Sequence, residues 1–209
     1  YIDVGIAEGH AVTYASGVAT GGFKPIIPFY STFLQRAYDN IFHDVLLQDL
    51  PVIFCMDRAG VVGPDGPTHH GVYDISLLRG LPNLIITAPK DGNELKNLIA
   101  TGLTLEKESM SIRYPKDTSY SYDENLEEEI LEIGSWEKLH SGDKTAILAT
   151  GSMVGIVNSN YSEICNKLGF NPELINARFI KPMDLEMLNE IENKFDLIIT
   201  MEEGALNGG

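Results

Sequence analysis

Short apolar runs alternate along the chain with stretches in which apolar residues recur every three or four positions. The apolar runs predict buried strands at 25–30, 51–56, 84–88 and 109–114, and the periodic stretches predict helices at 9–20, 31–46 and 91–103. Ser31 and Asp91 are typical helix N-cap residues, and we expect each to start the helix that follows it. Strands that alternate with helices indicate an α/β fold with a mainly parallel sheet.

A second series of the same kind follows closer to the C-terminus. It predicts strands at 145–150, 172–177 and 196–201 and helices at 152–168 and 184–193. The acidic stretch that separates the two series reads as a solvated linker. Gly151 and Ser152 form an ordinary turn between strand and helix, to which we assign no ligand. We therefore expect two incomplete α/β domains, at 1–120 and 135–209, joined by an acidic linker at 121–134.

Charge and composition narrow the possible partners. The chain has 15 Lys and Arg against 30 Asp and Glu, which gives a net charge of −15. Nucleic acids and anionic membranes reward clustered cations, so we do not expect either as the main partner. No apolar run approaches the ~20 residues of a membrane span, and no signal peptide is visible, so we expect a cytoplasmic protein. The chain begins at Tyr1 rather than Met, and we expect it to be a piece of a longer protein.

Residues suited to chemistry lie at the predicted junctions of strands and helices. Glu8 opens the first helix among small apolar residues, where it is either a helix-end acid or a functional carboxylate. His10, considered alone, is more typical of a structural histidine. Phe33 follows the strand that ends at Tyr30, and it is either a core residue or a stacking surface for a planar ring.

Three further polar segments follow buried strands or lie in the long loop between them. They are Asp57–Gly60, Asp65–Gly71 and Arg113–Pro115. The second contains adjacent histidines and an aspartate, but no second ligand cluster lies at the usual zinc spacing, so we do not expect a metal there. Because α/β proteins present ligand-binding groups at the carboxyl ends of their parallel strands, we expect these segments to contribute to one site.

Taken together, these segments resemble the 1-deoxy-D-xylulose-5-phosphate synthases, a thiamine-diphosphate-dependent family of the transketolase superfamily. The Tyr-Ser-Thr-Phe-Leu-Gln-Arg and Asp-Gly-x-Thr-His strings separate that family from transketolase proper and from dehydrogenase E1 β subunits. The resemblance covers essentially the whole chain and rests on the segments 3–13, 30–39, 57–71, 111–115, 177–184 and 202–204.

The resemblance implies a pyrimidine-binding domain followed by a transketolase-type C-terminal domain. It also implies a homodimeric transferase that condenses pyruvate with glyceraldehyde 3-phosphate, with release of CO₂, for isoprenoid and thiamine precursor synthesis. Thiamine diphosphate and Mg²⁺ are the implied cofactors. Glu8 matches the carboxylate that shares a proton with the aminopyrimidine ring, and Phe33 matches the aromatic residue that stacks on that ring.

The resemblance also implies how the acceptor is bound. Arg58 and Arg113 match the residues that bind its phosphate, and Asp65 and His69 match the loop residues that handle the aldehyde and its developing alkoxide. Four residues are close to the substrate in the family pattern: Tyr30, Ser31, His10 and Arg36.

This sequence departs from the family pattern at two points. The Gly-Asp-Gly motif that binds Mg²⁺ in the family is absent, so we expect that site in a further N-terminal domain, and we expect this chain alone to be inactive. Gly9 stands where the commonest family pattern carries Gln. Two alternatives stay open: another enzyme of the superfamily, such as a transketolase or a 2-oxo acid dehydrogenase E1 β subunit, and an inactive interaction fragment.

Overall fold

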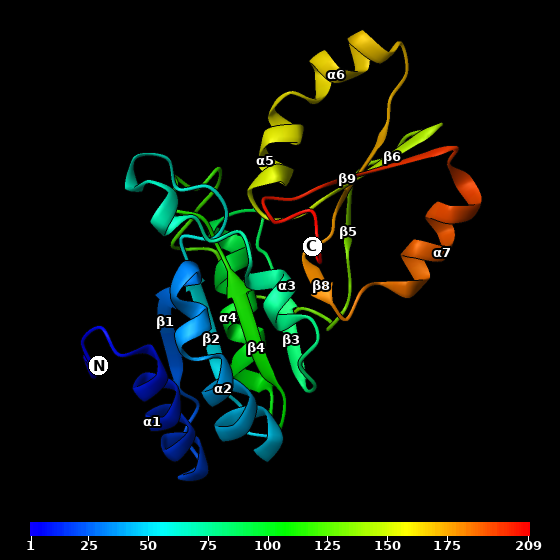
Figure 1. Cartoon of the computed structure of the whole chain (residues 1–209). Coiled ribbons are helices and arrows are strands. Elements are labelled where there is room, and N and C mark those ends of the chain that lie inside the picture. The colour runs from blue at the N-terminus through cyan, green and yellow to red at the C-terminus, as the bar shows by residue number, and fades with distance from the viewer.

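Two sheets organise the chain, and the computed structural model describes all residues from 1 to 209 (Figure 1). The first sheet has the order β1-β2-β4-β3-β8, and the second has the order β5-β7-β6-β9. The first comprises β1 (Ile26–Tyr30), β2 (Ile53–Asp57), β4 (Ser109–Arg113), β3 (Leu84–Thr87) and β8 (Phe179–Lys181). The second comprises β5 (Glu137–His140), β7 (Glu173–Asn176), β6 (Thr145–Ala149) and β9 (Leu197–Met201). Both are parallel except for β8 and β5, which confirms the predicted fold class.

Helices cover both faces of the first sheet, as the alternation of side chains along β2 requires. Phe54 and Met56 belong to a core with residues of α1, whereas Ile53 and Cys55 belong to a second core with Leu98 of α4. Figure 1 shows α1 and α4 on opposite sides of this sheet. The helices of the chain are α1 (Glu8–Thr20), α2 (Tyr38–Asn40), α3 (Asp74–Leu78), α4 (Gly92–Thr104), α5 (Ser152–Ser159), α6 (Tyr161–Leu168) and α7 (Leu185–Lys194). No helix has the length and apolar character needed to cross a membrane.

Two of the predicted helices are not continuous. Residues 31–48 form successive 3₁₀, α, π and 3₁₀ turns, although the apolar side chains predicted to share one face are mostly buried. Ser31 makes no capping bond, because its hydroxyl is buried without a hydrogen-bond partner, whereas Asp91 caps α4 through the backbone N–H of Glu94 as predicted. The predicted helix at 152–168 divides at Asn160 into α5 and α6.

The two halves of the chain share a core, which the sequence pattern did not indicate. Strand β8 lies far along the chain but pairs antiparallel with β3 at the edge of the first sheet. The indole N–H of Trp136 donates to the Phe179 carbonyl at 2.7 Å and helps to hold β8 in place. One apolar cluster runs from Ile53 and Leu98 in the first half to Ile175 and Phe179 in the second. The second half is therefore held directly against the first sheet.

Candidate active site

The parallel register brings three of the predicted segments to one edge of the first sheet. Tyr30 at the end of β1 pairs with Asp57 at the end of β2, and Met56 pairs with Arg113 at the end of β4. Because these strands are neighbours and run in the same direction, the residues that follow them lie side by side. The spacing in sequence gave no sign of which strands are adjacent, but the expectation of a common edge is met.

A ten-residue loop rises from this edge and is closed at its neck by two glycines. The Gly60 N–H donates to the Gly71 carbonyl at 2.8 Å, and the Gly71 N–H donates to the Gly60 carbonyl at 2.9 Å. A Cβ at Gly71 would lie 2.5 Å from both the Ser31 hydroxyl and the Arg58 carbonyl oxygen, so no side chain fits there. The loop carries Asp65 and His69 above the strand ends.

Arg58 is the centre of a charged cluster at the foot of the loop. Its guanidinium lies 2.7 Å from a carboxylate oxygen of Asp57 and 3.3 Å from one of Asp65, and it stacks 3.9 Å above the Tyr30 ring. The Lys116 ammonium contacts both Asp65 oxygens at 2.7 and 2.8 Å. Hydrogen bonds from Lys116 and Arg58 hold the pKa of Asp65 below its usual value. Asp65 is therefore an ionised hydrogen-bond acceptor at neutral pH rather than a general acid.

Three aromatic rings lie beside the Arg58 cluster. The Tyr30 and Phe33 rings are stacked at 5.7 Å, and the His69 ring meets Phe33 edge-on at 5.8 Å. His69 Nδ1 is 3.0 Å from the Thr68 hydroxyl, which leaves Nε2 for another partner. The loop histidine and the strand-end aromatic residues therefore form one surface, as expected of a site that spans both segments.

Glu8 is joined to this surface through Arg36. The Glu8 side chain is 10% exposed, and both of its carboxylate oxygens lie 3.3 Å from Nη1 of Arg36. The Arg36 guanidinium also stacks 4.3 Å from the centre of the Phe33 ring. A mostly buried carboxylate and a half-buried aromatic ring thus contact the same arginine. His10 is exposed, and its ring centre lies 6.3 Å from that of Tyr14.

Arg113 occupies a different environment from Arg58. Its Nε lies 2.8 Å from an Asp74 carboxylate oxygen, and its Nη2 donates to the Glu203 carbonyl at 2.9 Å. The side chains of Arg113 and Asp74 are only 5% and 1% exposed. Sequence reasoning missed Asp74 and the role of Lys116. The one signal for Asp74 was that an arginine in a buried strand needs an acidic partner.

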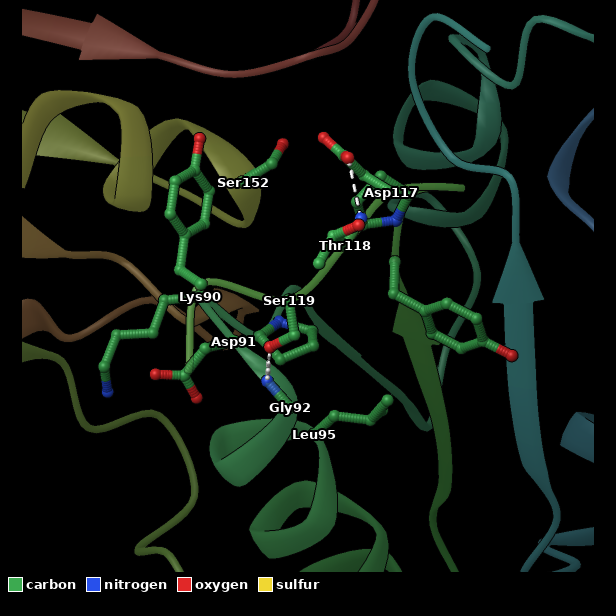
Figure 2. A pocket seen from close by; sticks show the side chains of 12 residues that line it. Lys90, Asp91, Gly92, Leu95, Asp117, Thr118, Ser119 and Ser152 are labelled. Atoms are coloured by element: carbon green, nitrogen blue, oxygen red, sulfur yellow. Dashed lines mark hydrogen bonds between the residues drawn. The ribbon is translucent and has the colours of Figure 1, made fainter. Parts of the chain in front are cut away.

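Two pockets of the molecule are lined by residues other than those of this surface. A pocket of about 140 Å³ lies between the start of α4 and the start of α5, and its lining includes Lys90, Asp91, Ser119 and Ser152 (Figure 2). A wider hollow of about 1120 Å³ runs along β8 and β9. No predicted site residue lines either space.

Comparisons with known proteins agree with this arrangement. Residues 1–120 match the transketolase pyrimidine-binding domain, and residues 134–209 match the transketolase C-terminal domain. The 1-deoxy-D-xylulose-5-phosphate synthases of Thermosynechococcus vestitus and Cyanothece sp. are 51% and 50% identical to the chain over its whole length. The match covers 33% of each of these proteins, so the chain spans about a third of the length of its curated relatives.

A solved structure supports the fold independently. This structure is a split-gene transketolase in the form of an inactive tetramer of β subunits. The match covers 100% of this chain and 67% of the transketolase chain, with a TM-score of 0.86 and 23% identity. At that identity the match shows the fold alone. The family resemblance read from the sequence motifs is confirmed by the two domain matches and by the curated relatives. The chain belongs to the transketolase family, and along its whole length it is similar to the 1-deoxy-D-xylulose-5-phosphate synthases within it.

Proposed function

We propose that this chain supplies the pyrimidine-binding and C-terminal parts of a thiamine-diphosphate-dependent transferase. The proposed reaction joins pyruvate to glyceraldehyde 3-phosphate with loss of CO₂ and yields a precursor for isoprenoid and thiamine synthesis. The proposal is supported by identities of 51% and 48%, over the whole length of this chain, to proteins named as synthases of this reaction. The structural observation that carries it is the chain of contacts from Glu8 through Arg36 to Phe33, beside the Arg58 cluster.

The residues present fit the aminopyrimidine end of the cofactor. When bound, thiamine diphosphate supplies the electron sink that decarboxylation of a 2-oxo acid requires. Glu8 is a mostly buried carboxylate, and it would share a proton with a ring nitrogen of the aminopyrimidine. Phe33 would stack on the same ring. We place Mg²⁺ in another part of the full-length protein by similarity to the family, whose Gly-Asp-Gly motif this sequence lacks.

The Arg58 cluster fits the phosphorylated acceptor. Arg58 is 20% exposed and Lys116 is 44% exposed, so both cations can reach a phosphate at the surface. Tyr30 and Ser31 would complete the phosphate end. Asp65, held ionised, would accept a hydrogen bond from an acceptor hydroxyl, and His69 would donate to the oxygen that develops negative charge.

We also propose that Arg113 and His10 contact the substrate. The Nε of Arg113 donates to Asp74, and its Nη2 donates to the Glu203 carbonyl. Arg113 would therefore bind the phosphate only through its third nitrogen, Nη1. His10 is exposed on α1 and would contact the substrate only from the open side of the site. We further propose that the complete protein is a cytoplasmic homodimer, by similarity to the family.

The direct test uses an enzyme of the relatives' full length that carries this segment. We expect it to consume pyruvate and glyceraldehyde 3-phosphate together, with one CO₂ released for each sugar phosphate formed, when thiamine diphosphate and Mg²⁺ are present. Transfer from a ketose phosphate without CO₂ release would indicate a transketolase. Decarboxylation that requires a lipoyl acceptor would indicate a dehydrogenase subunit, and no turnover of any of these substrates would favour an inactive interaction role.

A further inference from the structure

Glu203 follows β9, in the segment that returns from the second sheet to the first (Figure 1). Its carbonyl oxygen accepts the 2.9 Å hydrogen bond from Arg113 Nη2. Two residues later, the Ala205 N–H donates to the Val72 carbonyl at 2.8 Å, directly beside Gly71. The segment is therefore fixed to the first half of the chain at both the strand end and the loop neck.

The Glu203 side chain fills the space that Gly60 leaves open. A Cβ at Gly60 would lie 2.8 Å from Cβ and 3.0 Å from Cδ of Glu203, so the two residues are in close contact. Gly60 has a φ of +80°, a conformation that glycine adopts without strain. Contact and conformation together show that the neck of the loop is shaped around Glu203.

A second residue keeps the Glu203 carboxylate in this position. The Ser152 hydroxyl, at the start of α5, donates to Glu203 Oε2 at 2.6 Å (Ser152 is labelled in Figure 2). Ser152 belongs to the turn to which the sequence assigned no ligand, and its hydroxyl is used inside the molecule. A hydrogen bond to a charged acceptor is among the stronger kinds in proteins, so it restricts the rotamer of Glu203.

We propose that Glu203 is a positioning residue for the acceptor loop, acting from the C-terminal half of the chain. It supports Gly60, and the paired Gly60–Gly71 hydrogen bonds pass that support to Gly71. Gly71 in turn contacts the Ser31 hydroxyl and the Arg58 carbonyl. The position of Asp65 and His69 over the strand ends thus depends on a residue that itself touches no substrate. This inference rests on the proposed function, in which the loop binds the acceptor.

The experiment compares Glu203→Ala with the matched control Glu202→Ala in the enzyme of full family length. The control removes a carboxylate one residue away that makes no hydrogen bond to the loop neck. Hydrogen exchange followed by mass spectrometry reports on peptides that contain Gly60 and Gly71. Steady-state kinetics report KM for glyceraldehyde 3-phosphate and for pyruvate separately. Ser152→Ala provides a second variant that loosens Glu203 without removing it.

We expect Glu203→Ala to speed exchange at the loop neck and to raise KM for glyceraldehyde 3-phosphate by about tenfold, the effect expected if the displaced loop loses one charge-assisted hydrogen bond to this substrate. KM for pyruvate should stay within about twofold. Ser152→Ala should change both readouts in the same direction but by less, and Glu202→Ala should match the unmodified enzyme.

Three results would overturn the inference: unchanged exchange at the neck, an unchanged KM for the aldehyde, or a rise in both KM values together with faster exchange throughout the protein. The last pattern would mean that Glu203 only stabilises the fold. If the unmodified enzyme does not use these substrates at all, the proposed function fails instead. Exchange at the neck would then still decide whether Glu203 supports the loop.

Discussion

Arg113 and Asp74 form an ion pair with 2.8 Å between Nε and the carboxylate oxygen, and water reaches almost no part of either side chain. The second Asp74 oxygen is buried without a hydrogen-bond partner. A buried ion pair stabilises the fold little more than a well-packed apolar pair does, but the loss of one member leaves an uncompensated charge inside the protein. The Arg58 cluster, at the same sheet edge, is only partly buried, so water can solvate a partner that is left without its counterion.

Arg113→Ala should therefore destabilise the protein strongly, because it leaves Asp74 buried and unpaired. We expect a loss of about 3–5 kcal/mol in the free energy of unfolding, measured by urea denaturation. The double variant Arg113→Met with Asp74→Leu should recover most of this loss. Arg58→Ala is the matched comparison, and its loss should be clearly smaller. Equal midpoints for Arg113→Ala and the unmodified chain would contradict a structural role for the pair.

Arg58→Ala should selectively weaken binding of the phosphorylated acceptor by the full-length enzyme. Loss of one charge-assisted hydrogen bond costs about 1.5–3 kcal/mol, or roughly 10- to 100-fold in kcat/KM with glyceraldehyde 3-phosphate. Unphosphorylated glyceraldehyde should be affected little, and so should KM for pyruvate. Arg113→Ala belongs in the same assay, because it matches the phosphate-binding pattern as well. For either arginine, an equal loss with both aldehydes would rule out phosphate binding.

Glu8→Gln should reduce turnover in the full-length enzyme by on the order of 100-fold or more, since the amide keeps the shape but cannot share the proton. Folding should be almost unaffected, as judged by the melting temperature. Glu106→Gln, at an exposed position before β4, serves as the control for loss of one negative charge. A near-normal rate for Glu8→Gln would leave Glu8 as an ordinary acid at a helix end.

Glu173 should make stability depend on pH on the acid side. Burial alone would raise the pKa of Glu173, but hydrogen bonds from Lys194 and Lys138 outweigh it and hold the pKa below the ordinary value of 4.5. The folded state therefore binds this proton less readily than the unfolded state, so the stabilisation is present above about pH 4.5 and is lost as the pH falls. Glu173→Gln should be less stable than the unmodified chain at pH 7, and the difference should shrink at lower pH. Parallel curves would refute the assignment.

The two cysteines should differ in reactivity. Burial raises the pKa of the Cys55 thiol to about 11, whereas Cys165 is partly exposed on α6. Alkylation at pH 8 in the folded state should modify Cys165 first, and Cys55 should react at a comparable rate only in denaturant, because the thiolate is the reactive form. Peptide mapping after a timed reaction measures both sites. Rapid modification of Cys55 in the folded state would show that its strand opens to solvent.

Local patterns were enough to predict seven of the nine strands, but they missed the two antiparallel ones, β5 and β8. Every predicted strand is present, because short apolar runs rich in β-branched and aromatic residues, such as 51–56, favour a buried strand. Asp91 was identified as an N-cap because its carboxylate satisfies the nearby N–H of Glu94, a contact within four residues. Ser31 was predicted to be an N-cap on the same grounds, but it makes no capping hydrogen bond. Its surroundings are set by Gly71, forty residues away, which packs against its hydroxyl.

Contacts between segments that are distant in sequence determine the surroundings of the site residues. Glu8, Phe33, Arg58 and Asp65 were named from their types and motifs, but their neighbours Arg36 and Lys116 act through distances that only folding sets. The buried partner of Arg113 and the support of Gly60 by Glu203 both join residues far apart in the chain. Local propensity carries no information on such pairs. They follow from the order of strands in the sheet and from β8 joining its edge, which the burial of a shared apolar core determines.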